Sequence, residues 1–514
     1  MAALPDPSEP LSSQPLYPIV VIAVDRGHRG MSQLADRTDG IAILAHRKEL
    51  IPNLRLARQA QGDRTTEALV VVVLPSGMPG LIPLALASGA DRIVVFHTAD
   101  APRTRATEVA MRAGGALVDW FITPDYVSLK SAVRLGADAD RIDVIDLATT
   151  DTRLLYQRIA REPKRREPAS GVPEVAASLA LDALQFTGLL SLAERFGSDK
   201  GVNVVNYHRV LPFQELRTYC RPQMAISAAV FEAQLEAMAQ RGFVSIDAIH
   251  QPESAGRIAI TFDDGYEDNF RVALPMLQRF SAPACVFLVT GLIDEPNALW
   301  WDRVGLALFA YWRSGAPVPV PDELPRRARA LEHVRSYHDA RAAIIEVLSE
   351  LNHVDPSERE QAIATSERLV ATLTPARTML SWEEVRTMRR LGLDFGAHTR
   401  THVSLDEITP EIARDELLGS ITDLEAQIPD VSEHGRVAAL PRGKLGPLDE
   451  SELVRLGFTS VMLTTAGVNS VKDGSVMVKR RDGNYLTLRG RHHPAKMRLE
   501  LSGILDRIRR TTHD

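Results

Sequence analysis

The hydrophobic positions of residues 17–150 fall into short β-type runs that alternate with polar and helical stretches. The runs occupy residues 19–24, 40–44, 69–74, 92–96, 120–122 and 142–145. This alternation is typical of βα units around a parallel sheet. We therefore predict an α/β, Rossmann-like parallel-sheet domain for residues 17–160. The polar, proline- and serine-rich residues 1–16 are expected to be disordered.

Residues 161–173 (REPKRREPASGVP) break this pattern with charge and proline. Such a composition predicts a linker between separately folding parts. After it, apolar residues recur at three- and four-residue steps from Val175 to Ala193, which predicts a helix with one apolar face.

Composition limits the class of protein. A length of 514 residues suggests two to four domains, and 45% hydrophobic residues are ample for folded cores. A net charge of −6 argues against a general nucleic-acid or anionic-membrane binder. Only Cys220 and Cys285 are present, so no disulfide framework is implied, and the apolar surroundings of Cys285 predict a buried thiol.

Two polar motifs follow apolar runs in the second part of the chain. Asp263 and Asp264 come directly after residues 258–262 (IAITF), and His398 and His402 follow another apolar stretch. Two imidazoles and one carboxylate suit a borderline divalent metal such as zinc and leave coordination positions open. The spare carboxylate is a candidate general base. Alone, each motif has a plainer interpretation, a turn for the aspartates and a surface pair for the histidines.

These motifs carry a resemblance to a known family. Residues 261–266 (TFDDGY) and 398–402 (HTRTH) resemble the first two motifs of polysaccharide deacetylases, the NodB-homology or carbohydrate esterase 4 family. Four other segments agree with the branch whose motif order is permuted: 206–210 (NYHRV), 231–243, 381–385 and 440–444 (LPRGK, its YPxG-like loop). The resemblance spans about residues 172–485.

The resemblance implies a distorted (β/α) barrel of the NodB-homology type, with fewer than eight strands, over residues 174–490. A helical insertion at about 291–378 interrupts it and should lie on the active-site face. Residues 491–514 are expected to form a C-terminal tail in which His492 and His493 are solvated.

The resemblance also implies roles for single residues. Asp264, His398 and His402 would hold a divalent metal, zinc first, with cobalt, nickel or manganese as alternatives. Asp263 would act as the catalytic base. His208 would be the acid, although a structural role at a strand end is the alternative.

The remaining implied roles concern the oxyanion and the substrate. The backbone N–H of Arg442 would stabilise the oxyanion. Tyr266 and Trp301 are expected beside the substrate, with burial of the indole as the alternative. Arg480 or Arg481 would orient the base.

Residues 119–145 of the N-terminal part are similar to the acceptor-side half of family-4 GT-B glycosyltransferases. The sugar-nucleotide half is missing, because the deacetylase-like part begins where it should be. We therefore expect a non-catalytic domain that binds a glycan or partners from polysaccharide biosynthesis.

The sequence thus predicts an enzyme that removes N-acetyl groups from N-acetylhexosamine units of a polysaccharide, an oligosaccharide or a lipid-linked saccharide. Two alternatives remain: a hydrolase of other amides or imides, and a non-catalytic glycan-binding scaffold. Neither a signal peptide nor a transmembrane segment is evident, so a cytoplasmic location is expected.

Overall fold

The computed structural model describes residues 201–506 except 296–298, 316–319, 335–336, 371–376 and 473. Before them it describes helices α7 and α8, and, N-terminal to these, six strands, helix α5 (Tyr126–Arg134) and three single positions. The chain divides into two compact units, Met1–Ala132 with Arg141–Val175, and Val133–Asp140 with Ala176–Asp514. No described helix is long and apolar enough to cross a bilayer.

The N-terminal unit contains the predicted parallel sheet. Its six strands pair in the order β2-β1-β3-β4-β5-β6, and every pairing is parallel. The strands are nearly continuous runs of apolar residues, as is usual where both faces of a sheet are covered. Their bounds are β1 (Ile19–Ala23), β2 (Ala42–Leu44), β3 (Leu69–Val73), β4 (Arg92–Phe96), β5 (Trp120–Thr123) and β6 (Ile142–Val144).

The predicted linker overlaps the start of a helix. Helix α7 (Pro168–Phe186) begins inside residues 161–173 and is followed by α8 (Leu189–Gly197). Proline at the first helical position costs little, because its missing N–H would have no partner there. Proline at residue 168 therefore starts this helix rather than excluding it.

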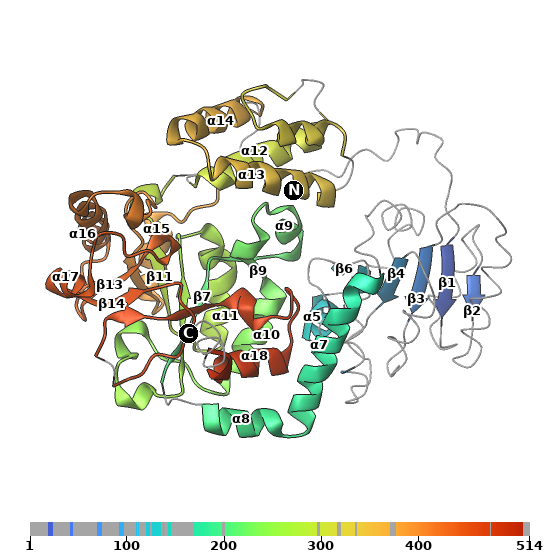
Figure 1. The fold of residues 1–514 in the computed structure, drawn as a ribbon, viewed down its shortest axis with the longest axis horizontal. Helices are drawn as coiled ribbons and strands as arrows, with labels where there is room; N and C mark the ends of the chain where they lie inside the picture. The colour runs from blue at the N-terminus through green and yellow to red at the C-terminus, as the bar shows by residue number, and fades with distance from the viewer. Residues whose placement is uncertain are drawn as a thin grey trace. The chain divides into compact units, whose positions relative to one another are not determined.

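The second unit is built on an eight-stranded, wholly parallel sheet (Figure 1). The strands neighbour one another in the order β7, β10, β11, β12, β13, β14, β15, and β16 pairs with the other edge of β7. This arrangement is a nearly closed barrel, as predicted, but the expectation of fewer than eight strands is wrong. The strands are β7 (Asn203–Tyr207), β10 (Ile258–Phe262), β11 (Ala284–Leu288), β12 (Asp394–Ala397), β13 (Arg436–Ala439), β14 (Phe458–Met462), β15 (Met477–Val478) and β16 (Arg480–Asp482).

Helices connect most of these strands, and a small two-stranded sheet lies beside the first. The helices are α10 (Ala228–Ala239), α11 (Leu274–Arg279), α15 (Trp382–Arg390), α16 (Pro410–Gln427) and α17 (Glu450–Arg455). The small sheet pairs β8 (Arg209–Leu211) with β9 (Ala225–Ser227), and α9 (Phe213–Thr218) joins them.

The last barrel segment is interrupted at Lys479, which separates β15 from β16. The segment before the break, β15, pairs with β14, and the segment after it, β16, pairs with β7. The Asn469 side chain accepts from the Lys479 N–H at 2.8 Å and donates to its carbonyl at 2.8 Å. Asn469 also exchanges backbone hydrogen bonds with Val202. One amide side chain thus supplies the hydrogen bonds that the interrupted ladder lacks.

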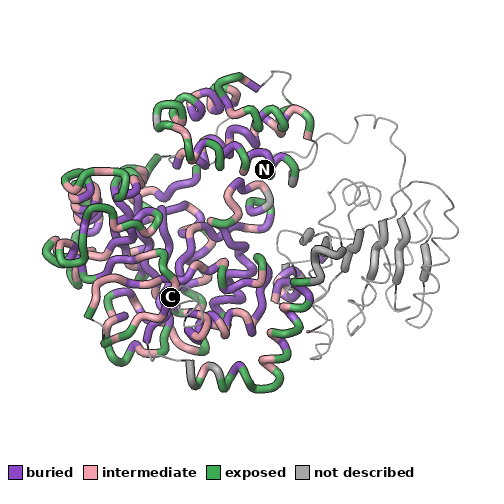
Figure 2. Tube along the Cα trace, viewed as in Figure 1, coloured by how far each residue is buried: buried purple, intermediate pink, exposed green. Residues whose placement is uncertain are grey.

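The barrel strands form the buried core of this unit (Figure 2). All residues of β7, β10 and β11 are buried. A cluster that includes Val204, Ala259, Phe287 and Met462 fills the core between the strands. Cys285 belongs to the same cluster, which confirms its predicted burial.

The insertion is helical, as predicted. It contains α12 (Trp300–Ser314), α13 (Tyr337–Leu351) and α14 (Pro356–Arg368), which lie together in Figure 1. Their apolar faces form a second core cluster, which also includes Tyr219, Cys220 and Tyr266 from the barrel part. At Gly305 a Cβ would lie 2.2 Å from the Cys220 sulfur, so only glycine allows α12 to pack this closely.

The expected solvated tail is wrong for residues 491–506. His492 and His493 are buried, and α18 (Pro494–Leu501) follows them. The His493 ring nitrogen Nε2 lies 3.2 Å from Ser178 Oγ, and Asp506 forms a buried ion pair with Arg481. Ser178 lies on α7, 315 positions before His493, and Arg481 lies on β16. The polar composition of the segment does not reveal either partner.

Candidate metal centre

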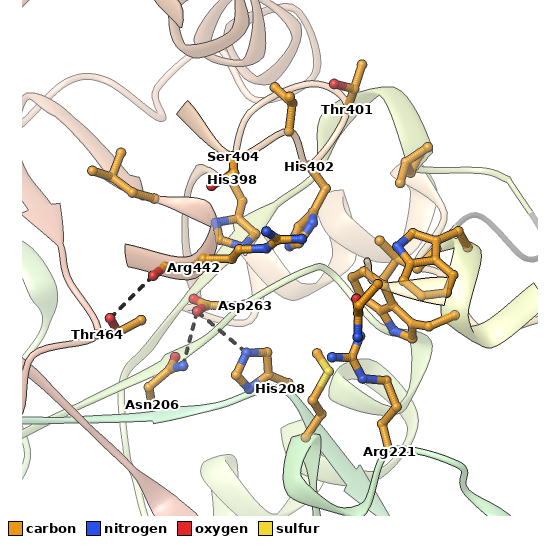
Figure 3. A pocket seen from close by; sticks show the side chains of 18 of the residues that line it. Asn206, His208, Arg221, Asp263, His398, Thr401, His402, Ser404, Arg442 and Thr464 are labelled. Atoms are coloured by element: carbon orange, nitrogen blue, oxygen red, sulfur yellow. Dashed lines mark hydrogen bonds and ion pairs between the residues drawn. The ribbon is translucent and has the colours of Figure 1, made fainter. Parts of the chain in front are cut away.

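The two predicted motifs meet at the carboxyl end of the barrel. Asp263 and Asp264 follow β10, and His398 directly follows β12. Because parallel strands end at the same edge, these loops converge above the barrel. Figure 3 shows Asp263, His398 and His402 around one cavity.

Asp264, His398 and His402 form a compact group of metal-ligand type. Their ligand atoms lie within 4.8 Å of one another. The Nε2 atoms of His398 and His402 are each 3.3 Å from Asp264 Oδ1. His398 and Asp264 are buried, and His402 is partly buried.

The hydrogen bonds around this group fit a cation. His398 Nδ1 lies 2.8 Å from the Ala439 carbonyl oxygen, to which it must donate, so the neutral ring has its lone pair on Nε2. Both oxygens of Asp264 are buried, and neither has a hydrogen-bond partner in the described part of the chain. Buried lone pairs that face one another are costly unless a cation lies between them. The donor set therefore fits a divalent metal.

The protonation states agree with metal binding. Burial would raise the pKa of Asp264, but the two imidazoles outweigh it and hold that pKa well below its usual value. Burial lowers the pKa of His402 more than Asp264 raises it. Asp264 is thus ionised and His402 neutral at pH 7, which are the forms that bind metals. Burial would also lower the pKa of His398, but Asp264 and Asp263 outweigh the effect of burial, so that pKa is raised instead.

Three predicted site residues have left-handed backbone conformations. The φ angle is 76° at Asp264, 62° at His402 and 56° at Arg442. Such conformations are uncommon for residues other than glycine and cost about 1–3 kcal/mol each. The strain is concentrated in the loops that carry the candidate site. Residues 398–402 form a tight loop and not a helix, and this loop orients the two histidines.

Asp263 lies beside the metal-ligand group with three polar neighbours. Arg480 donates to both carboxylate oxygens at 2.6 and 2.8 Å, and Asn206 Nδ2 donates at 3.1 Å. His208 Nε2 is 3.9 Å from Asp263 Oδ2. Burial would raise the pKa of Asp263, but Arg480 and His398 outweigh it, so the pKa is lowered and the group is ionised at pH 7.

The loop after β13 brings Arg442 to the same cavity. Its side chain is exposed and donates to Glu407 at 2.9 Å. Among the described residues, its backbone N–H has no hydrogen-bond acceptor. Leu440, which stands where an aromatic residue was expected, is buried and lines the cavity.

The remaining predicted site residues are divided between the cavity and the buried core. Tyr266 is fully buried and does not line the cavity, and its hydroxyl accepts from the Trp301 indole N–H at 3.1 Å. Trp301 is 5% exposed but lines the cavity. Arg481 forms ion pairs with Asp506 and Glu500, whereas Arg480 contacts Asp263.

A cavity of about 680 Å³ is lined by His208, Asp263, His398, His402 and Arg442. The barrel loops supply the reactive groups, and the insertion supplies one wall. Lining residues from the insertion are Leu292, Leu299, Trp300, Trp301, Arg303, Asn352, Arg359 and Glu360.

Comparison with known proteins places this geometry in a family context. Residues 250–461 match the family model of polysaccharide deacetylases. The matched deacetylase segment contains Asp263, Asp264, His398 and His402, which supports this family for the barrel. The permuted motif order and the glycosyltransferase likeness of the N-terminal part stay predictions.

Solved structures of deacetylases are similar to the chain at low identity. The deacetylase PplD of Streptococcus pyogenes, in complex with acetate, is 16% identical, and the match covers 55% of this chain and 91% of PplD with a TM-score of 0.34. IcaB from Ammonifex degensii is 19% identical with the same coverage and TM-score. A de-N-acetylase from Aggregatibacter actinomycetemcomitans is 16% identical, covering 54% and 93% with a TM-score of 0.33. No curated protein matches the chain.

Sequence reasoning gave no role to three residues that line the cavity. Asn206 bridges Arg480 and Asp263, and its position one residue before the Tyr207–His208 pair was the available signal. Arg221 and Arg359 line the insertion side. They occur in segments without a recognised motif, so the sequence alone gave no reason to select them.

Proposed function

We propose that the barrel hydrolyses N-acetyl groups of N-acetylhexosamine units in a polysaccharide, an oligosaccharide or a lipid-linked saccharide. One observation carries the proposal: Asp264, His398 and His402 converge, and the two histidines line a single cavity together with the ionised Asp263. The family match of residues 250–461 supports deacetylation.

Asp264, His398 and His402 would hold the metal. Two nitrogen ligands and one oxygen ligand favour zinc, with cobalt, nickel and manganese as alternatives. The bound ion would supply Lewis acidity towards an amide carbonyl and a lower pKa for a water in the cavity.

Asp263 is the proposed base. It accepts a proton from the water whose oxygen attacks the acetamide carbonyl carbon. Arg480 and Asn206 hold the carboxylate in place through three hydrogen bonds, so little reorganisation is needed when the proton moves.

His208 and Arg442 complete the proposed reaction. The carbonyl oxygen gains negative charge, which the Arg442 backbone N–H is available to stabilise. His208 lines the cavity and is about one-fifth exposed, so it can give a proton to the leaving nitrogen as the C–N bond breaks. The products are acetate and a free amine.

The cavity favours a saccharide over a small cyclic amide. Its volume of about 680 Å³ lies in the range of pockets that take ligands larger than a single small ring. The insertion extends one wall beyond the reactive groups. A small imide would leave most of this wall without contact.

The test is direct. Purified, zinc-loaded protein is incubated with N-acetylated oligomers of glucosamine, galactosamine and mannosamine and with a cyclic imide, and acetate and free amine are measured. We expect acetate and amine from at least one oligomer. Hydrolysis of the imide alone would favour the alternative amide hydrolase, and no hydrolysis at all would favour a non-catalytic scaffold.

A further inference from the structure

One wall of the cavity alternates guanidinium groups and indole rings. The Arg221 guanidinium carbon lies 4.5 Å from the centre of the Trp301 ring, and that of Arg359 lies 5.0 Å from the Trp300 ring. The two indoles contact each other edge to face, with centroids 5.7 Å apart. We call these four residues the Arg–Trp wall. Figure 3 shows Arg221 extending towards the cavity beside the indoles.

The wall begins next to the candidate metal centre. The Trp301 ring lies 5.2 Å from the His402 ring, and both residues line the cavity. A substrate with its acetamide near His402 would therefore place neighbouring parts against Arg221 and then Arg359.

The two arginines of the wall differ from the other guanidinium groups of the cavity. Three cavity arginines each form an ion pair with a carboxylate: Arg303 with Glu367, Arg442 with Glu407 and Arg480 with Asp263. Within the described part of the chain, neither Arg221 nor Arg359 does so. Arg359 donates to the carbonyls of Leu351, Asn352 and Val354, and the exposed carboxylate of Asp355 interacts with it electrostatically but forms no close ion pair with it.

The Arg221 side chain has fewer hydrogen-bond partners than that of Arg359. Its guanidinium forms no hydrogen bond or ion pair with the residues that the structure describes, and the residue is only partly buried. The carboxyl of Asp302 interacts with it electrostatically, but that carboxyl is completely buried on α12 and forms no ion pair with Arg221. All five donors of the Arg221 fork are thus available to a ligand.

The wall is better suited to charge than to a sugar face. Sugar rings stack on open aromatic faces, whereas a guanidinium already lies over each of these indoles. Guanidinium groups stacked on aromatic rings are held in a fixed orientation, and a planar fork matches the oxygens of carboxylate and phosphate groups. The indoles therefore position the arginines.

We infer that the Arg–Trp wall binds an anionic substituent of the saccharide, the carboxylate of a uronic acid or a phosphate ester. This inference rests on the proposed function, because it names the substrate class of the same cavity. The preferred substrate is then an acidic N-acetylated saccharide, and a neutral oligomer is a poorer one.

The test compares matched substrates. An N-acetylglucosamine oligomer is prepared in three forms: neutral, carrying one glucuronic acid residue, and carrying a terminal phosphate ester. For wild type, we expect kcat/KM to be about tenfold or more higher for one anionic form than for the neutral form. Whether the uronate or the phosphate form is preferred identifies the source of the charge. The preference should shrink as salt is added.

Variants locate the effect. Arg221→Met keeps an apolar stem against Trp301 and should lower the anionic-to-neutral ratio about tenfold. Arg359→Met should also lower it, and Arg221→Lys should recover part of it, because the charge stays but the fork is lost. Arg326→Met, in an exposed position of the insertion, should leave the ratio unchanged.

Direct binding separates the two hypotheses. Calorimetric titration of the same three oligomers reports binding even if no acetate is released. Tighter binding of an anionic form without hydrolysis would support the wall and contradict the deacetylase proposal. Equal binding and equal turnover of all three forms by the wild type would overturn the inference, as would a ratio unaffected by Arg221→Met and Arg359→Met in folded protein.

Discussion

Arg480 donates hydrogen bonds to both carboxylate oxygens of Asp263, with nitrogen–oxygen distances of 2.6 and 2.8 Å. Both side chains are almost completely buried. Asp263 follows β10 and Arg480 begins β16, so this pair joins the candidate base to the strand that closes the barrel. The same contact therefore contributes to the site and to the fold.

Removal of the Arg480 charge should disturb the candidate site and destabilise the fold. Arg480→Gln leaves Asp263 buried without its cation, so we expect the free energy of unfolding to fall by about 3–5 kcal/mol. The double variant Asp263→Asn/Arg480→Gln should regain part of this loss, because no charge is left unpaired. Arg327→Gln, which breaks the exposed pair with Glu346, should cost less than about 1 kcal/mol. Denaturant titrations measure all three, and equal losses for the buried and exposed pairs would contradict this account.

Asp263→Asn should keep the metal and lose turnover. The amide is nearly isosteric and can still accept from Arg480, but it cannot take a proton from water at neutral pH. We expect kcat to fall roughly a hundredfold or more, with metal content unchanged by elemental analysis. Activity near that of the wild type would place the base elsewhere.

His398→Ala/His402→Ala should abolish stoichiometric metal binding. The wild type should bind one divalent metal per chain through Asp264 and the two histidines. His353→Ala/His434→Ala removes two exposed histidines and serves as the matched control, which should retain the metal. Full metal content in the first double variant would exclude this ligand set.

Asp302 should make stability depend on pH. Burial raises the pKa of this carboxyl from 3.8 to about 6, although Arg209 and Tyr266 lower it. The folded state therefore binds the proton more tightly than the unfolded state, so the contribution is complete below pH 3.8 and is lost as pH rises through about 6. Relative to Asp302→Asn, wild type should lose up to about 3 kcal/mol between pH about 4 and about 8. Parallel unfolding curves for both proteins across that range would refute the prediction.

A fragment that begins at residue 168 should fold and bind metal. It keeps α7 and α8, and Glu194 of α8 forms ion pairs with Arg241 and Arg498. A fragment that begins at residue 201 loses these contacts and should be less stable. We expect the longer fragment to hydrolyse short soluble oligosaccharides, whereas hydrolysis of a substrate bound through the N-terminal domain should decrease. An insoluble or metal-free longer fragment would show that the two units depend on each other.

Local patterns indicated the candidate metal-ligand group, whereas the barrel was implied by the resemblance to polysaccharide deacetylases. Asp263 and His398 directly follow apolar runs, with Asp264 next to Asp263, and the end of a parallel strand determines where such residues lie. The alternation of short runs likewise predicted the six-stranded sheet of the N-terminal unit. In each case the relevant information lies within a few neighbouring residues.

Other features depend on register and on distant partners. Arg480 and Arg481 are adjacent, and consecutive residues of a strand point to opposite faces. Arg480 therefore contacts Asp263 while Arg481 contacts Asp506, but the sequence of so short a strand does not reveal which residue faces which way. The burial of His493 depends in the same way on Ser178, 315 positions earlier.

The pair of Asp263 and Arg480 also has a consequence for folding order. These residues are 217 positions apart, and Arg480 can reach Asp263 only after the final strand has docked. Such long-range contacts form late, because a large loop must first be ordered. The carboxylate would thus acquire its cation in the last step of ring closure. A chain that has folded every earlier strand would still lack the guanidinium that fixes the orientation of the candidate base.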